Sequence, residues 1–263
     1  MTDWRNVIER GCPLPAGPGV ASAIAELTEA LRSPDPVLRD EQAFTVAAGW
    51  IPQLDPGTRR RLGDTMAARF GDGEIQARSF AALIIAAIVA QGDFEPGWLT
   101  AFTSWYRSET DLRGYDAALG WLHAVAHGAD LLGAFGRCPR VDPAPLLDLA
   151  AARLLARTDY LFGCQEDDRL GYAIGLTLTR EELSADQAVD WLEPVSADFA
   201  AGRPGPVPAH ASNTMRTLRV LYLLADRGVR PDWNSGDPVP LRYREALLRR
   251  LAAVLALVSP FTG

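Results

Sequence analysis

The residues best suited to chemistry in this chain are two histidines four positions apart, His123 and His127. They are two of the three histidines among 263 residues, and Asp130 follows three positions after the second. An α-helix advances by about 100° per residue, so on one helix these side chains and Asp116 would share a face about 60° wide. Imidazoles and carboxylates together can transfer protons, bind polar ligands or hold metal ions. The spacing therefore predicts one polar face with a possible function.

The element expected to position these side chains is a helix over 115–136. Trp121, Val125 and Leu132 fall on its opposite side, so we expect them to pack into the core. The neighbours of the histidines are mostly small and uncharged, whereas an ordinary exposed face carries long charged side chains. A small polar face suits hydrogen bonding to another helix or contact with a ligand. We therefore predict that the two histidines and Asp130 face one shared polar cavity.

Charged residues elsewhere could complete a site at this face. Arg113 precedes the predicted helix and could hold a carboxylate or phosphate with two hydrogen bonds, or bond to a neighbouring aspartate instead. Asp40 and Glu41 lie just inside a predicted helix start, where acidic side chains favour the helix dipole, and the acidic run 166–168 has the same explanation. Alternatively, one acid from each cluster faces the histidines and forms a carboxylate–imidazole pair for proton transfer.

Metal binding is the least favoured role of the histidine pair. Histidines at positions i and i+4 can share an ion on one helix, as in zinc proteases. Here Ala124 stands where those enzymes have a glutamate, and Asp130 lies about 10 Å from His123 along the helix axis. A mononuclear site needs about three protein ligands, and the sequence does not fix where His210 lies. We assign no metal ligand and expect no cofactor.

Composition limits the possible partners. The formal net charge of −7 argues against a nucleic acid or an anionic membrane. The chain contains no lysine, which excludes Schiff-base, pyridoxal-phosphate and P-loop lysine chemistry.

Three cysteines without a CxxC pair are typical of a reducing compartment. The start of the chain lacks a signal-peptide pattern, and the longest apolar run, 80–90, is shorter than the roughly 20 residues that cross a bilayer. We therefore expect a cytoplasmic protein without nucleic-acid or membrane partners.

Helical periodicity fills most of the chain, and no alternating run is long enough for a substantial sheet. Pro36 and Pro56 each follow an aspartate and indicate helix starts, whereas Pro194 is expected to kink or split its helix. The stretches 202–208 and 228–240 are rich in proline and glycine and are predicted loops. We predict helices at 3–10, 20–32, 36–51, 56–70, 74–91, 96–108, 115–136, 144–157, 167–178, 185–200, 211–227 and 240–257.

The predicted architecture is a single all-α domain over residues 1–263. The helices come in pairs with short connections, which indicates antiparallel helical hairpins packed side by side. Stacking of such hairpins produces an α-solenoid whose inner helices line a groove. The sequence shows no clean repeat, so any repeats are degenerate.

The central segment of the chain resembles a bacterial family, the domain of unknown function 2785. The residues that carry the resemblance are Asp111, Arg113-Gly114-Tyr115, Gly120-Trp121, His123 and Ala126-His127-Gly128-Ala129-Asp130-Leu131-Leu132. Weaker matches occur at 38–41 and 166–169, and the similarity extends from about Trp4 to Arg250. The resemblance implies an all-helical, HEAT-like fold and implies no reaction.

Two functions are compatible with these residues. The first is a binding protein that presents a polar groove to a small molecule or peptide. The residues assigned to that groove are His123, His127, Asp130, Asp116, Arg113, Asp40 and Glu41. The second is an enzyme that uses both histidines, with nearby carboxylates, for acid–base or metal-assisted chemistry. The sequence does not indicate an oligomeric state.

Overall fold

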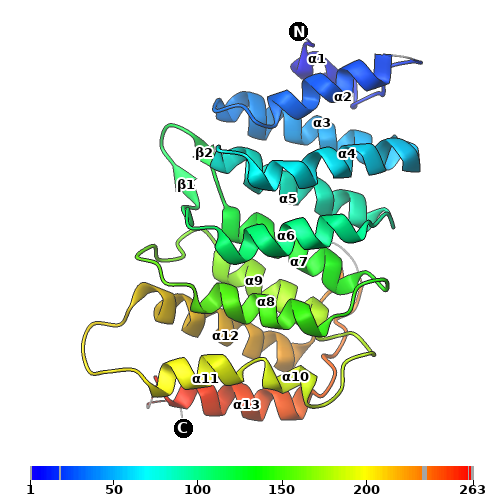
Figure 1. Ribbon diagram of the computed structural model, residues 1–263. Helices are drawn as coiled ribbons and strands as arrows, with labels where there is room; N and C mark the ends of the chain where they lie inside the picture. Colours follow the sequence, from blue (N-terminus) through cyan, green and yellow to red (C-terminus); the bar gives the residue numbers. More distant parts are fainter. Residues whose placement is uncertain (1, 18, 233–235, 260, 262–263) are drawn as a thin grey trace. The chain divides into compact units, whose positions relative to one another are not determined.

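A computed structural model describes residues 2–17, 19–232, 236–259 and 261 (Figure 1). The chain divides into two compact units, residues 1–131 (unit 1) and 132–263 (unit 2), and each is described by itself. Helices dominate both units, and the described residues contain one two-stranded sheet, so the all-α prediction is confirmed in its broad form. That the chain forms a single domain stays a prediction.

Unit 1 is built around one apolar helix. Its elements are α1 (Trp4–Glu9), α2 (Gly19–Ala30), η1 (Val37–Ala43), α3 (Phe44–Trp50), η2 (Ile51–Gln53), α4 (Pro56–Ala68), η3 (Arg69–Gly71), α5 (Ile75–Ala90), α6 (Pro96–Ser108), β1 (Tyr115–Asp116), β2 (Gly120–Trp121) and the first part of α7 (Ala124–Arg137). Most residues of α5 are buried, and it packs against α3 and α4. A helix that is apolar all round is a buried one, which explains the run 80–90. No helix of the described chain is long and apolar enough to span a membrane.

The helix starts in unit 1 follow the expected chemistry at one place and depart from it at another. At α4, the carboxylate of Asp55 accepts the amide of Thr58 at 3.0 Å, and Pro56 occupies the first turn, as predicted. The predicted helix 36–51 instead begins with the π-helical segment η1 and continues as α3. The wider π-helical turn is rare and often found at functional sites. Here it contains Arg39, whose side chain is completely buried.

The predicted helix over 115–136 is wrong over residues 115–123. Strands β1 and β2 form an antiparallel hairpin over residues 115–121, with Tyr115 opposite Trp121. Helix α7 begins only at Ala124. Asp116 therefore lies in a strand, and it does not share a helical face with the histidines.

Local turn chemistry explains why the hairpin forms where a helix was expected. The carboxylate of Asp116 accepts the amides of Ala118 and Leu119 at 2.9 and 3.0 Å, which closes the turn between the strands. Gly120 then adopts a φ of 71°, a conformation that glycine reaches without steric cost. These two features interrupt the helical pattern of the surrounding residues.

Unit 2 is arranged around the long helix α12. Its elements are the end of α7, α8 (Ala144–Leu155), α9 (Glu166–Thr177), α10 (Gln187–Asp190), α11 (Glu193–Ala200), α12 (Ala209–Arg227) and α13 (Arg244–Ala256). Helix α12 packs against α8, α9 and α13, and Figure 1 shows it lying among them. The prediction that Pro194 splits the helix 185–200 is confirmed, because Pro194 lies in the first turn of α11.

One predicted helix start and one predicted loop of unit 2 need adjustment. Helix α12 starts at Ala209, two residues before the predicted start at 211, so His210 belongs to the first turn of this helix. The stretch 228–240 contains an isolated antiparallel bridge between Val229 and Val239, with backbone hydrogen bonds of 2.9 and 2.8 Å. Residues 233–235 of that stretch lie outside the described residues.

Candidate functional site

The end of the 115–121 hairpin is fixed by Arg39 and Asp40. The buried guanidinium of Arg39 donates to the carbonyl oxygens of Leu119 at 2.6 Å and Trp121 at 3.1 Å. Asp40 pairs with Arg39 at 2.6 Å and accepts the Trp121 amide at 3.3 Å. A buried charge is tolerated when it is paired and hydrogen-bonded in this way. The hairpin is therefore anchored to η1 by a charge pair and main-chain hydrogen bonds.

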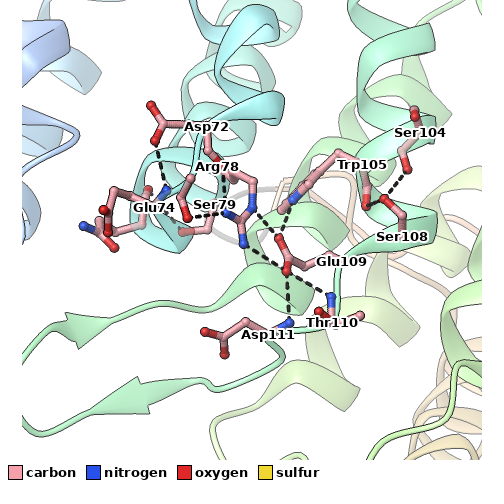
Figure 2. A network of polar contacts seen from close by, with 12 residues as sticks. Asp72, Glu74, Arg78, Ser79, Ser104, Trp105, Ser108, Glu109, Thr110 and Asp111 are labelled. Carbon is pink, nitrogen blue, oxygen red and sulfur yellow. Dashed lines mark hydrogen bonds and ion pairs between the residues drawn. The ribbon is translucent and has the colours of Figure 1, made fainter.

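The start of the hairpin segment is fixed by Glu109 (Figure 2). Arg78 of α5 donates to both carboxylate oxygens of Glu109, at 2.6 and 3.1 Å. The indole of Trp105 in α6 donates at 2.7 Å, and the amides of Thr110 and Asp111 both donate at 3.0 Å. This network ties α5 and α6 to the chain immediately before the hairpin.

Arg113 bonds to its neighbours, which was one of the two roles considered for it. It donates to Asp111 at 2.9 and 2.7 Å and to Asp116 at 2.7 Å. The guanidinium is thus shared between two carboxylates of the same segment. Because the pairs are open to solvent on the Arg113 side, we expect each to stabilise the hairpin by less than about 1 kcal/mol.

The three carboxylates around the hairpin differ in the direction of their pKa shifts. Burial raises the pKa of Asp40, and the charge of Arg39 offsets this only in part. The hydrogen bond from Arg113 lowers the pKa of Asp111, and two hairpin amides lower the pKa of Asp116. Of the three, Asp40 is the carboxyl group that takes up a proton most readily. Asp40 and Asp116 both serve the hairpin, which argues against a role as metal ligands beside the imidazoles.

His123 joins the hairpin to α7 in a left-handed backbone conformation, with a φ of 44°. Its amide donates to the carbonyls of Arg113 and Gly114 at 3.2 Å, and its carbonyl accepts the amide of His127 at 2.8 Å, which starts α7. Histidine reaches positive φ more readily than most residues, but the conformation is still uncommon. Such strain is typical of positions that the surrounding structure holds in place.

The two imidazoles belong to a continuous series of ring contacts that leads from the core to the surface. Buried Phe80 meets His127 edge-on at 5.0 Å between ring centroids, and His127 meets His123 at 5.4 Å. Trp121 lies 4.5 Å from His123, and Tyr115 meets Trp121 edge-on at 5.0 Å. We call these five residues the aromatic series. Its inner members are buried, whereas Trp121 is 42% exposed and Tyr115 is 55% exposed.

The prediction that Trp121 packs into the core is therefore wrong. Trp121 lies in a strand and not on the buried side of a helix, and its indole faces solvent beside His123. Val125 and Leu132 are fully buried, as predicted.

The remaining predicted site residues lie at the edges of this region. Asp130 is in α7, one turn beyond His127, and is partly exposed, whereas Glu41 is exposed on η1. A cavity shared by the two histidines and Asp130 stays a prediction. The acidic run 166–168 belongs to unit 2, where Glu166 accepts the amide of Cys164 at 2.7 Å.

Comparison with known proteins identifies the family of this chain. The sequence model of one protein family, described as protein of unknown function (DUF2785), matches residues 68–223, which is more than half of the chain. The matched span contains the hairpin and all three histidines but not Arg39, and it is shorter than the expected range from Trp4 to Arg250. No curated protein and no solved structure gives a significant match. The chain belongs to the DUF2785 family of proteins of unknown function.

Proposed function

We propose that this protein binds a small molecule or peptide at the exposed end of the aromatic series. Tyr115 and Trp121 form the contact surface, and His123 lies beside them. The exposed indole carries the proposal. Burial of a large apolar side chain stabilises by about 1.5–3 kcal/mol, so a partner that covers these rings gains free energy of that order. Tryptophan and tyrosine are also the side chains most often found as anchors of binding surfaces.

Charged groups around the rings would give the surface its specificity. Asp116 lies on the same hairpin as the two exposed rings, and Arg113, just before the hairpin, pairs with it. Ligand sites commonly combine an aromatic surface with a few placed polar groups. Asp40 supports the surface through the backbone of the hairpin, and His127 supports it through its ring contact with His123. Asp130 and Glu41 lie at the edge of the proposed site.

The anchoring of the hairpin supports this role. Arg39 holds one end of it and Glu109 holds the other, so the rings are positioned before a ligand arrives. A preorganised surface loses less conformational entropy on binding than a mobile loop does.

The HEAT-like stacking of helix pairs and a cytoplasmic location belong to the same proposal. The stacking is supported by the packing of successive helices, such as α4 with α5 and α8 with α9. The cytoplasmic location is supported by the three cysteines without a CxxC pair. The net charge of −7 supports a partner other than nucleic acid or membrane.

The proposal is tested by saturation-transfer NMR of the full chain with a fragment library and, separately, a mixture of short peptides. We expect ligands whose signal is lost in Trp121→Ala. The matched control is Tyr222→Ala, which removes an exposed aromatic ring from α12 of unit 2. The proposed surface is rejected if the two substitutions reduce the ligand signals equally, or if no ligand signal depends on Trp121.

A second candidate function is an enzyme that uses His123 and His127 with nearby carboxylates. The strained backbone of His123 beside the exposed Trp121 favours it. A screen with ester, phosphoester and peptide substrates separates the two. Turnover that His123→Gln abolishes would favour the enzyme, whereas binding without turnover favours the first candidate.

A further inference from the structure

Unit 2 contains a cavity that is lined by residues of this unit. It has a volume of about 690 Å³ and is lined by the loop 201–208, by Arg157 and by residues of α11 and α12. Ligand cavities are commonly about 300–1,000 Å³, so the space suits a small molecule. Its walls separate into a charged part and an apolar part.

The charged part centres on Arg157, Asp198 and His210. Arg157 donates to one oxygen of Asp198 at 2.6 Å, and the same guanidinium contacts the imidazole of His210. The other oxygen of Asp198 lies 3.3 Å from Nε2 of His210. His210 is buried in the first turn of α12, whereas 70% of the Arg157 side chain is exposed. Partly buried Asp198 and buried His210 thus hold an exposed guanidinium at the cavity.

Arg157 retains donors for a ligand. A guanidinium carries five N–H groups, and the contacts with Asp198 and His210 use the two terminal nitrogens. Nε of Arg157 has no hydrogen-bond partner among the described residues, so N–H groups remain in the planar arrangement that matches a carboxylate or phosphate. Arg203 of the loop also lines the cavity. Two arginines and one aspartate make this a locally positive place in a chain of net charge −7.

The apolar part provides a surface for the body of a ligand. Phe199, Met215 and Leu257 line it, together with Val207 of the loop. Val207 and Leu257 are among the large apolar side chains that stay exposed in unit 2. Three prolines occur in the loop 201–208, and each fixes its own φ near −65°, which limits the conformations of this wall before a ligand binds.

We propose that this cavity binds a small molecule that carries a carboxylate or phosphate group on an apolar body. Arg157 holds the anionic group, with Arg203 nearby. The apolar body lies against Phe199, Met215 and Leu257. This site is independent of the proposed binding at Trp121 and can be tested without it.

Titration calorimetry of the full chain with octanoate, octyl phosphate, inorganic phosphate and octanol tests the proposal. We expect octanoate, octyl phosphate or both to saturate one site, and we expect the other two probes to bind much more weakly. Arg157→Gln should weaken binding by about tenfold or more, because charge-assisted hydrogen bonds are lost. Arg249→Gln is the matched control, since Arg249 is an exposed arginine of α13 that does not line the cavity.

Heteronuclear NMR of the same titrations locates the ligand, with shift changes expected at Phe199, His210 and Met215. If octanol binds as tightly as octanoate, the cavity does not recognise the anionic group. If phosphate binds as tightly as octyl phosphate, the cavity does not recognise the apolar body. Either result overturns the inference, as does the absence of saturable binding of both amphiphiles or equal effects of the two arginine substitutions.

Discussion

Arg39 and Trp121 lie 82 positions apart in the chain, and the buried guanidinium of Arg39 donates to the carbonyl oxygen of Trp121 at 3.1 Å. The same guanidinium donates to the carbonyl oxygens of Leu119 at 2.6 Å and Ser33 at 2.9 Å. Arginine stays charged at every relevant pH, so this donor is permanent. Arg39 therefore ties the end of the exposed hairpin to the interior of unit 1, together with Asp40.

We predict that Arg39→Met lowers the free energy of unfolding by about 3–5 kcal/mol, because it leaves Asp40 without its partner and the hairpin carbonyls without their donor. Urea denaturation measures the change, and limited proteolysis shows whether residues 115–121 become cleavable. Arg113→Gln is the control, with an expected loss below about 1 kcal/mol because its ion pairs are exposed. Similar losses for both substitutions would mean that Arg39 does not anchor the hairpin.

Gly120 lies close to the start of η1. A Cβ added there would lie 2.5 Å from Cβ of Pro36 and 3.1 Å from the Asp40 carboxylate, and the φ of 71° disfavours any other residue. We predict that Gly120→Ala lowers the unfolding free energy by about 1–3 kcal/mol, through both strain and overpacking. Gly97→Ala in α6 is the matched control, since its Cβ would meet no atom within 4 Å. That control should be neutral or should stabilise by about 0.4–1 kcal/mol. Equal effects of the two alanines would argue against close packing at Gly120.

Glu109 should make unit 1 sensitive to acid. Burial raises the pKa of Glu109, but hydrogen bonds from Arg78, the Asp111 amide and Trp105 outweigh it, so the pKa lies below its usual 4.5. The stabilisation is therefore present above pH 4.5 and is lost as the pH falls through the folded-state pKa. We predict that Glu109→Gln lowers the unfolding free energy by about 1–3 kcal/mol at neutral pH. The difference from the unsubstituted protein should shrink in acid.

The measurement is urea denaturation at a series of pH values from neutral to acidic. Glu41→Gln provides the control, because Glu41 is exposed on η1 and should leave the curve almost unchanged. A constant difference between Glu109→Gln and the unsubstituted protein at every pH would contradict the role assigned to the carboxylate.

Much of the helical framework is predictable because its causes are local. The apolar run in α5 and the Asp55-Pro56 start of α4 act within a few residues, so periodicity and capping predict both helices. Pro194 likewise splits its predicted helix through its own geometry.

The centre of the candidate site was harder to predict, for two physical reasons. Strands of two residues are too short to show the alternation of apolar and polar residues that indicates a strand. The helical pattern after His123 is therefore wrongly extended toward the N-terminus, over β1 and β2. Asp116 and Gly120 do carry a turn signal, which could have ended the predicted helix. Arg39 gives no local signal at all, because its acceptors Leu119 and Trp121 are about eighty positions away and only the folded chain brings them together.

The last prediction concerns His127, which lies edge-on to Phe80 and to His123 inside the aromatic series. Aromatic contacts of this kind stabilise by about 0.5–1.5 kcal/mol each, beyond the area that they bury. His127→Gln removes the ring, so we expect it to lower the unfolding free energy by about 1–3 kcal/mol. His127→Phe retains a ring of similar shape and should lower it less.

The same two variants separate packing from chemistry. If His127 only supports His123 and the exposed Trp121, His127→Phe should retain any ligand found by the NMR screen. If the imidazole itself takes part in binding or proton transfer, His127→Phe should lose that ligand although it folds better than His127→Gln. Thermal unfolding and saturation-transfer NMR on both variants give the two readouts. A larger loss of stability in His127→Phe than in His127→Gln would show that polar contacts of the imidazole outweigh its ring contacts, and would contradict the packing role assigned to the aromatic series.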